Sequence, residues 1–294
     1  MIVGAGDVLV ADPVAALADL ASHRATLTTS FDGTVSGAAQ KWTRVTTLAL
    51  TKDPHAGVLT VVTTGAIGAA DPAWIAEQNG VVYTLDAAGA CSAQLADPET
   101  SVLEEPAVQL PGVWGGTAAG TETVNGIETS VAAIDAASIG YGGDTTATGK
   151  VWVATASGLV VRYDVTMTAG PDVFGENTSG TSETHYSLTD VNAPVTPDIP
   201  SSCATGLVDA PLPPGATVVM SEPGVLTATT TSSVAEVAAF YAGAASGAGW
   251  TSAEPPGIAP TAAILKFTSP TTRVEVIVTS RAGVTGITIL TART

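Results

Sequence analysis

The stretch from Lys150 to Ala169, KVWVATASGLVVRYDVTMTA, constrains this chain most strongly, because it predicts a long two-stranded hairpin with unequal faces. With a short turn at residues 156–158, apolar side chains gather on one face and polar side chains on the other. Such a strand pair must cover its apolar face with a partner, a ligand or another part of the chain. The predicted apolar face comprises Trp152, Ala154, Leu159, Val161, Tyr163, Val165 and Met167, and the polar face Arg162, Asp164, Thr166 and Thr168.

The composition favours strands and turns over long helices. Of 294 residues, 45% are hydrophobic but only 5% aromatic and 13% charged, while Gly and Thr occur throughout. The formal net charge of -17, from 27 acidic against 10 basic residues, excludes a nucleic-acid-binding surface, which needs a basic patch. We interpret the acidity as a solubilising surface.

Local signals divide the chain into short elements. A short amphipathic helix is expected over residues 12–24, and a second one from residue 97 until Pro106 stops it. Asn-Gly pairs at 79–80 and 125–126 predict tight hairpin turns. Residues 106–120 read as a loop, which either tucks its apolar residues onto the core or acts as a mobile lid over a cavity.

Proline-rich residues 192–206 predict a linker between two domains. We expect a first domain over residues 1–195, a linker over 196–206 that contains Cys203, and a second domain over 207–294. The second domain is predicted to be a small α+β module of β-α-β-β-β order, whose helix opens with a capping box at residues 233–236. The predicted fold class of the whole chain is α+β.

Two cysteines, Cys91 and Cys203, lie in polar, turn-rich segments. Both could be buried thiols, but we favour a disulfide between them, because a free thiol in such surroundings would be exposed. A disulfide implies an oxidising, extracytoplasmic setting. It would also tie the C-terminal module to the first domain.

The sequence contains no catalytic or metal-binding motif. His23, His55 and His185 are scattered, and none has a second histidine at ligand spacing, so we expect no metal site. A nucleophile elbow, a phosphate-binding loop and a metalloprotease motif are all missing. Glu104 and Glu105 are adjacent rather than facing, and we expect Glu104, beside a helix end, to be solvated rather than catalytic. We therefore expect no enzyme and no cofactor.

Aromatic residues recur at the alternate strand positions that face the apolar side of successive predicted hairpins. One interpretation is that they form the core under packed helices, and the other is that they line the concave side of a curved sheet that holds acyl chains. The candidate lining residues are Trp42, Trp74, Tyr83, Trp114, Trp152, Val161, Tyr163 and Val165.

In order and pattern, the chain resembles the LolA/LppX/LprG-like superfamily of bacterial lipoprotein carriers. The resemblance rests on the predicted helix that ends at residues 22–24, the hairpin over 150–169, and the segments FDGTV, NGVVYTLD, ETVNGIET and HYSLTDVN. The resemblance covers about residues 10–195. It implies a curved antiparallel half-barrel covered by helices, an apolar cavity for lipids or acyl chains, and no catalytic residues. It also implies export, with an export signal that is not part of this sequence, and it leaves anchoring at a membrane open.

Together these features predict an extracytoplasmic, envelope lipoprotein-like carrier or binding protein for a lipid or other hydrophobic ligand. The ligand would occupy an apolar half-barrel cavity, and no nucleic acid would bind. The alternative is a surface structural or protein-interaction module whose half-barrel is filled by its own side chains. A cavity inside the sheet distinguishes the two.

Overall fold

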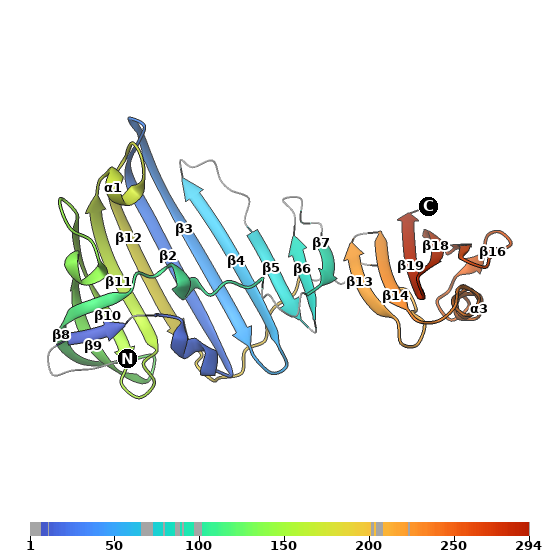
Figure 1. Ribbon diagram of the computed structural model, residues 1–294, viewed down its shortest axis with the longest axis horizontal. Helices are drawn as coiled ribbons and strands as arrows, with labels where there is room; N and C mark the ends of the chain where they lie inside the picture. Colours follow the sequence, from blue (N-terminus) through green and yellow to red (C-terminus); the bar gives the residue numbers. More distant parts are fainter. Residues whose placement is uncertain are drawn as a thin grey trace. The chain divides into compact units, whose positions relative to one another are not determined.

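The chain forms two compact units in a computed structural model (Figure 1). The N-terminal unit consists of Met1–Asn79 and Ser101–Asp198, and the C-terminal unit of Gly80–Thr100 and Ile199–Thr294. These units differ from the predicted domains chiefly in residues 80–100, which group with the C-terminal unit. The structure describes residues 7–10, 12–65, 73–78, 80–85, 89, 91–96, 102–200, 203, 208–222 and 224–293.

One curved antiparallel sheet builds the N-terminal unit (Figure 1). Its long strands β2 and β3 are each 14 residues long and pair along their whole length. The sheet confirms the predicted antiparallel architecture, in which each strand pairs with its neighbours by main-chain hydrogen bonds. In spatial order its strands are β1 (Asp7–Val10), β8 (Val113–Val124), β9 (Ile127–Asp135), β10 (Thr146–Ala154), β11 (Val160–Ala169), β12 (Thr178–Thr189), β2 (Ser22–Val35), β3 (Ala38–Thr51), β4 (Ala56–Gly65) and β5 (Ala73–Gln78).

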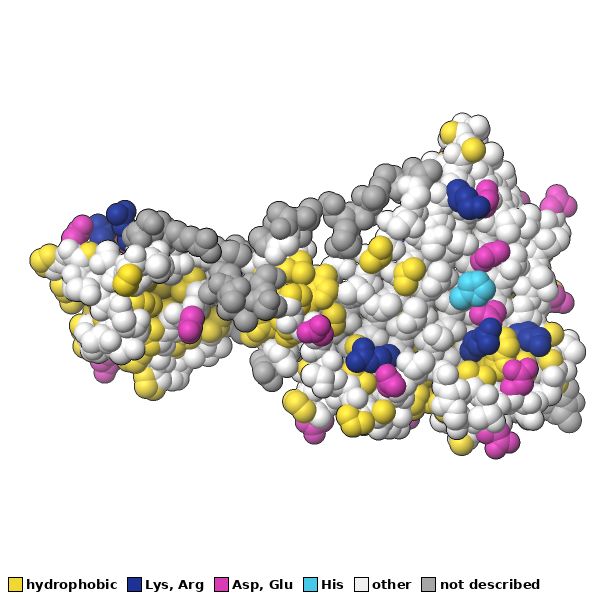
Figure 2. Space-filling view, turned by 180° about the vertical axis from the view of Figure 1, so that it is seen from behind, with side chains coloured by type: hydrophobic (Ala, Val, Ile, Leu, Met, Phe, Trp, Pro, Cys, Tyr) yellow, Lys and Arg dark blue, Asp and Glu magenta, His cyan; other side chains and the backbone are white. Residues whose placement is uncertain are grey.

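Alternation along the strands gives this sheet two different faces. The inner face carries Leu27, Leu48, Tyr163 and Tyr186, which all belong to one buried hydrophobic cluster. The outer face carries mainly polar side chains, and Figure 2 shows charged side chains scattered over this face of the N-terminal unit with few hydrophobic ones. Val10 of β1 belongs to the same cluster as Leu27, so the curled edge of the sheet packs over the inner face.

Short helical turns, rather than long helices, cover the inner face. The prediction of a helix over residues 12–24 is wrong beyond its first turns: a 3-10 helix, η1, spans Ala15–Asp19, and β2 begins at Ser22. His23 pairs with Leu50 across β2 and β3, so the sheet ladder overrides the local helical pattern. Further short helices are η2 (Pro106–Gln109), η3 (Ala137–Ile139) and α1 (Pro171–Phe174).

The segment expected as a loop, residues 106–120, is ordered as η2 and most of β8. Pro106 begins η2 instead of ending a helix, because proline fits the first turn, where its missing N–H has no partner to lose. Leu110 and Val113 are buried, as expected for apolar residues tucked onto the core. The predicted start of the second helix, residues 97–101, lies outside the described residues.

The predicted hairpin forms as β10 and β11, but the prediction put Trp152 on the wrong face. Trp152 pairs with Arg162, whereas Val153 pairs with Val160, so β11 holds one extra residue at this point. Such a bulge inverts the alternation beyond it. Val151, and not Trp152, therefore shares the inner face with Tyr163, its partner across the ladder.

On the outer face, the Trp152 ring contacts two polar groups. The Arg162 guanidinium lies 4.6 Å from the ring centroid, and the indole N–H donates to Glu122 Oε2 at 2.8 Å. Trp152 is only 5% exposed, although it does not belong to the hydrophobic cluster of the inner face. Trp152 is therefore part of a cation–π stack on the polar side.

The C-terminal unit is built of antiparallel strands, with α3 (Val234–Ala244) packed on one face. The predicted capping box is confirmed, since Ser233 and Glu236 exchange hydrogen bonds at the start of α3. Its strands are β6 (Val81–Leu85), β7 (Cys91–Leu95), β13 (Thr217–Glu222), β14 (Val225–Thr230), β19 (Val284–Arg293), β18 (Thr272–Arg281) and β17 (Ala262–Thr268), with β15 (Thr251–Ser252) and β16 (Gly257–Ala259) both on β17.

A disulfide joins Cys91 and Cys203, as predicted. Both cysteines are buried and both belong to the C-terminal unit, so the bond does not tie one unit to the other as the sequence had suggested. It instead fastens β7, which comes from the first part of the chain, to the segment that leads into β13.

Replacing both cysteines by alanine is expected to lower the free energy of unfolding of the C-terminal unit by about 3–5 kcal/mol, because a long closed loop restricts the unfolded chain. Trp250 is the single tryptophan of that unit, so fluorine NMR of fluorotryptophan-labelled protein follows its unfolding in urea. The Trp152 signal is the internal control. An unchanged midpoint for Trp250 would contradict a stabilising role.

Candidate functional site

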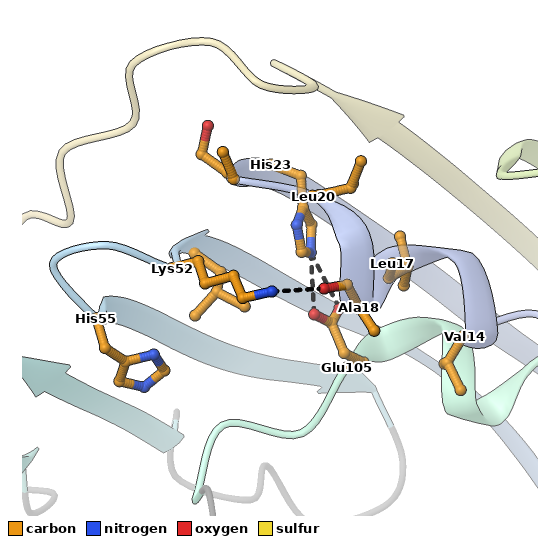
Figure 3. Close-up of a pocket in the computed structure, with 11 residues that line it drawn as sticks. Val14, Leu17, Ala18, Leu20, His23, Lys52, His55 and Glu105 are labelled. Carbon is orange, nitrogen blue, oxygen red and sulfur yellow. Dashed lines mark hydrogen bonds and ion pairs between the residues drawn. The ribbon is translucent and has the colours of Figure 1, made fainter. Parts of the chain in front are cut away.

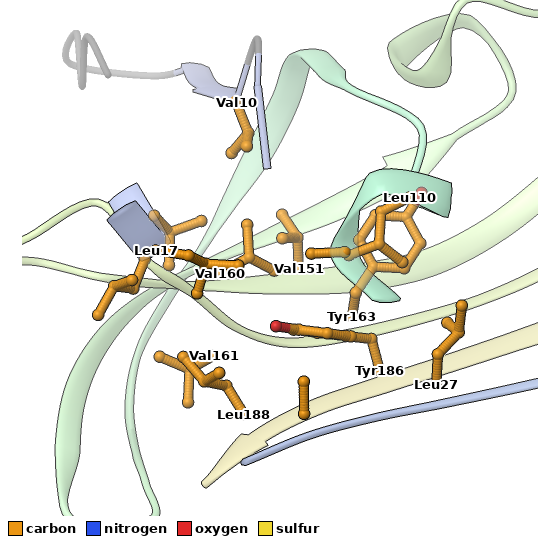
Figure 4. Close-up of a cluster of buried hydrophobic side chains, with 14 of the residues drawn as sticks. Val10, Leu17, Leu27, Leu110, Val151, Val160, Val161, Tyr163, Tyr186 and Leu188 are labelled. Carbon is orange, nitrogen blue, oxygen red and sulfur yellow. The ribbon is translucent and has the colours of Figure 1, made fainter. Parts of the chain in front are cut away.

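The middle of the inner face is filled by side chains. Val161, Tyr163 and Val165, predicted to line a cavity, are buried in one cluster with Leu110, which directly follows η2 (Figure 4). Desolvation by burial raises the pKa of Tyr163 and that of Tyr186, its cross-strand partner. Neither hydroxyl has a hydrogen-bond partner among the described residues. This region is therefore a packed core.

A pocket of about 310 Å³ opens at the end of the inner face where β2 begins and β3 ends (Figure 3). One side is apolar and the other carries ionisable groups, so the pocket is amphipathic. The apolar side is formed by Val14, Leu17, Ala18, Leu20, Ala21 and Leu50, and the polar side by Ser22, His23, Lys52, His55 and Glu105.

His23 lies on the inner, apolar face of β2, on the same side of the strand as Ala25 and Leu27. It is only 2% exposed, and its Nε2 lies 3.0 Å from Glu105 Oε1 and 3.2 Å from Oε2. Glu105 is the residue that immediately precedes η2, so the start of this helix sets the position of its carboxylate. The pair gives a buried imidazole the polar partner that burial demands.

Lys52 and His55, in the turn between β3 and β4, place two further nitrogen-bearing groups at the pocket. Lys52 Nζ donates to the Ala18 carbonyl at 3.0 Å, which holds the turn against η1. His55 Nε2 lies 3.4 Å from Glu77 Oε1, and His55 remains 44% exposed. The other oxygen of Glu77 is buried and has no hydrogen-bond partner among the described residues.

Gly57 allows the apolar side of the pocket to form. A Cβ atom at this position would lie 2.5 Å from Leu103 Cδ1 and 2.9 Å from Leu50 Cδ1. Any larger residue would therefore push both leucines away from β4. The absence of a side chain lets Leu50 stay beside η1, where it lines the pocket.

The other predicted lining residues lie elsewhere. Trp42 is on the inner face but at the far end of β3, with its ring centroid 6.0 Å from that of Phe31. Trp74 lies on the outer face of β5, Trp114 is 50% exposed on β8, and Tyr83 belongs to the C-terminal unit. Trp152 lies on the outer face as well, on the side of the sheet opposite to Tyr163.

The residues that do line the pocket were not singled out as ligand-binding. His23 offered one usable signal, because a histidine in register with buried aliphatic residues needs a polar partner. Glu105 and Lys52 gave none, since their positions depend on η2 and on the turn after β3.

Within the described residues, no group of three or more His, Cys, Asp or Glu side chains is arranged to hold a metal ion. None of the helices in that part of the chain is long and apolar enough to cross a membrane.

Comparison with known proteins finds matches among solved structures alone: no family model and no curated protein matches. One solved structure is Mycobacterium tuberculosis lipoprotein LppX, at 21% identity and a TM-score of 0.32, covering 63% of this chain and 94% of that one. Another is a DUF1329 family protein from Desulfovibrio piger, at 13% identity and a TM-score of 0.22, covering 65% and 96%.

LppX bears the name of the group that the sequence resembles. With TM-scores this low, neither structure assigns a site, a ligand or a partner to this chain.

Replacing Glu105 by leucine is expected to lower the free energy of unfolding by about 1–3 kcal/mol, because buried His23 then loses its partner. The matched control is the same change at exposed Glu104, for which we expect a loss within about 0.5 kcal/mol. Urea unfolding measures both. Equal losses for the two variants would contradict a specific His23–Glu105 interaction.

Proposed function

We propose that this protein is an extracytoplasmic, non-catalytic binding protein or carrier for a lipid or other hydrophobic ligand. The observation that supports this function best is the pocket beside η1, where leucine side chains and ionisable groups share a space of about 310 Å³. An amphiphile would place its hydrocarbon chain against Leu17, Leu20 and Leu50 and its polar end toward Lys52.

The size of the pocket favours a single acyl chain. Its volume is near the lower end of the range for ligand pockets, roughly 300–1,000 Å³. Each buried CH₂ group contributes about 0.8 kcal/mol, which must offset the entropy lost on association. A chain of moderate length can therefore bind through burial, with the head group adding specificity.

The polar side suits an anionic head group. The Lys52 ammonium and the half-exposed His55 ring supply donors, and charge-assisted hydrogen bonds to a carboxylate are stronger than neutral ones. Glu105 is engaged by His23, with Nε2 at 3.0 Å, so its negative charge is partly compensated. A fatty acid is the simplest ligand of this kind.

The disulfide between Cys91 and Cys203 supports the compartment in this proposal. Structural disulfides persist in secreted and periplasmic proteins and are rare in the reducing cytosol.

The alternative, a structural or interaction module with a self-filled half-barrel, also has a specific observation in its favour. Tyr163 and Tyr186 occupy the middle of the inner face, where the sequence had left room for a ligand. Under this alternative, the pocket beside η1 binds no amphiphile, and binding measurements decide between the two.

Filling the pocket with Leu50→Trp is expected to weaken binding of dansyl-undecanoate by about tenfold or more, because the indole occupies the space of the chain. Leu290→Trp, at a 36% exposed site in the C-terminal unit, is the matched control and should bind like the unmodified protein. Dansyl fluorescence measures both. An absence of binding to the unmodified protein would overturn the proposed function.

Lys52→Met is expected to weaken binding of undecanoate by about fivefold at low salt, because an exposed ion pair contributes up to about 1 kcal/mol. Undecanol has no charge, so its affinity should stay the same in this variant. Displacement of the dansyl probe gives both affinities. Equal loss for the acid and the alcohol would contradict a head-group role for Lys52.

A further inference from the structure

A second pocket, of about 450 Å³, lies on the outer face of β2–β5, and Thr196 and Asp198 form its side wall. It arises from the same strand alternation as the first pocket: Arg24 and Thr26 point outward from β2, whereas His23 points inward. The two pockets share no lining residue. The second pocket is thus a separate site with its own chemistry.

A row of hydroxyl groups crosses this pocket and ends at an aromatic ring. Thr26, Thr47, Thr60 and Trp74 are successive cross-strand partners on β2, β3, β4 and β5. All four are half-buried, so the row is partly accessible. The Thr47 and Thr60 hydroxyls are hydrogen-bonded to each other, which fixes the middle of the row.

The pocket is lined by one basic and one acidic side chain, Arg24 and Asp198. Arg24 Nε lies 3.0 Å from Asp190 Oδ2, and the Arg24 side chain is 47% exposed. Asp198 is exposed and lines the pocket from the wall segment. Ala49 and Val58, which also line the pocket, supply a small apolar area.

We propose that the outer pocket binds a neutral saccharide. A pyranose ring has an apolar C–H face, which packs against an aromatic ring such as that of Trp74. Its rim carries hydroxyl groups that both donate and accept, and these match the threonine hydroxyls, the Arg24 donors and the Asp198 acceptor. The volume lies within the range of small-molecule pockets.

Other ligand classes fit less well. A phosphate or carboxylate would meet Asp198 and find Arg24 already paired with Asp190, in a chain of net charge -17. An acyl chain would have to desolvate the threonine row, and burying hydroxyl groups without partners is costly. A polyhydroxylated, uncharged ligand meets neither obstacle.

The test uses the full chain and a panel of neutral disaccharides of glucose, mannose and galactose, with inorganic phosphate and decanoate as comparison probes. Saturation-transfer NMR detects binding of each probe. We expect at least one disaccharide to bind, and neither phosphate nor decanoate to displace it. Binding of no disaccharide, or displacement by decanoate, would overturn the proposal.

Trp74→Ala is expected to weaken disaccharide binding by about tenfold or more, and Trp74→Phe to restore part of it. Thr47→Val removes a hydroxyl with little change of shape and should weaken binding while the fold is kept. Trp114→Ala, at a 50% exposed site on β8, is the control and should bind normally. Unchanged binding in both the Trp74→Ala and the Thr47→Val variants would overturn the proposal.

Discussion

The inner face of the curved sheet is the constraint on which the N-terminal unit depends. Alternation along β2 and β3 gathers Leu27, Leu48 and their neighbours on one side, and water must be excluded from that side. The curled edge, with Val10 and Val113, covers the middle together with η2, while η1 covers the end near His23. The pocket lies where this cover becomes incomplete. Its position is thus a consequence of how short the covering elements are.

The strand β2 shows how one element serves two pockets. His23 and Arg24 are adjacent in the chain, yet one is 2% exposed beside Glu105 and the other is an exposed partner of Asp190. The inner pocket combines aliphatic side chains with ionisable groups, and the outer pocket combines threonine hydroxyls with an indole. Because the chemistry of a pocket selects its ligand, we expect amphiphiles on one face and saccharides on the other.

Local signals predicted the parts of the fold that depend on local physics. The turn at Asn125 and Gly126 has positive φ at both residues, as an Asn-Gly hairpin requires, and the capping box at Ser233 forms. The face predicted for Trp152 was wrong, because the alternating pattern of the sequence gives no sign of the bulge in β11. The site was missed because the partner of His23 lies 82 residues away, and only the fold brings them together.

In the proposed function, a ligand enters the pocket beside η1 and leaves the packed middle of the sheet undisturbed. Hydrogen–deuterium exchange with and without undecanoate tests this most directly. We predict slower exchange at the start of β2 and in the turn that contains Lys52 and His55, with no change in β11 around Tyr163. Changed exchange around Tyr163 and Tyr186, with none near His23, would contradict the account.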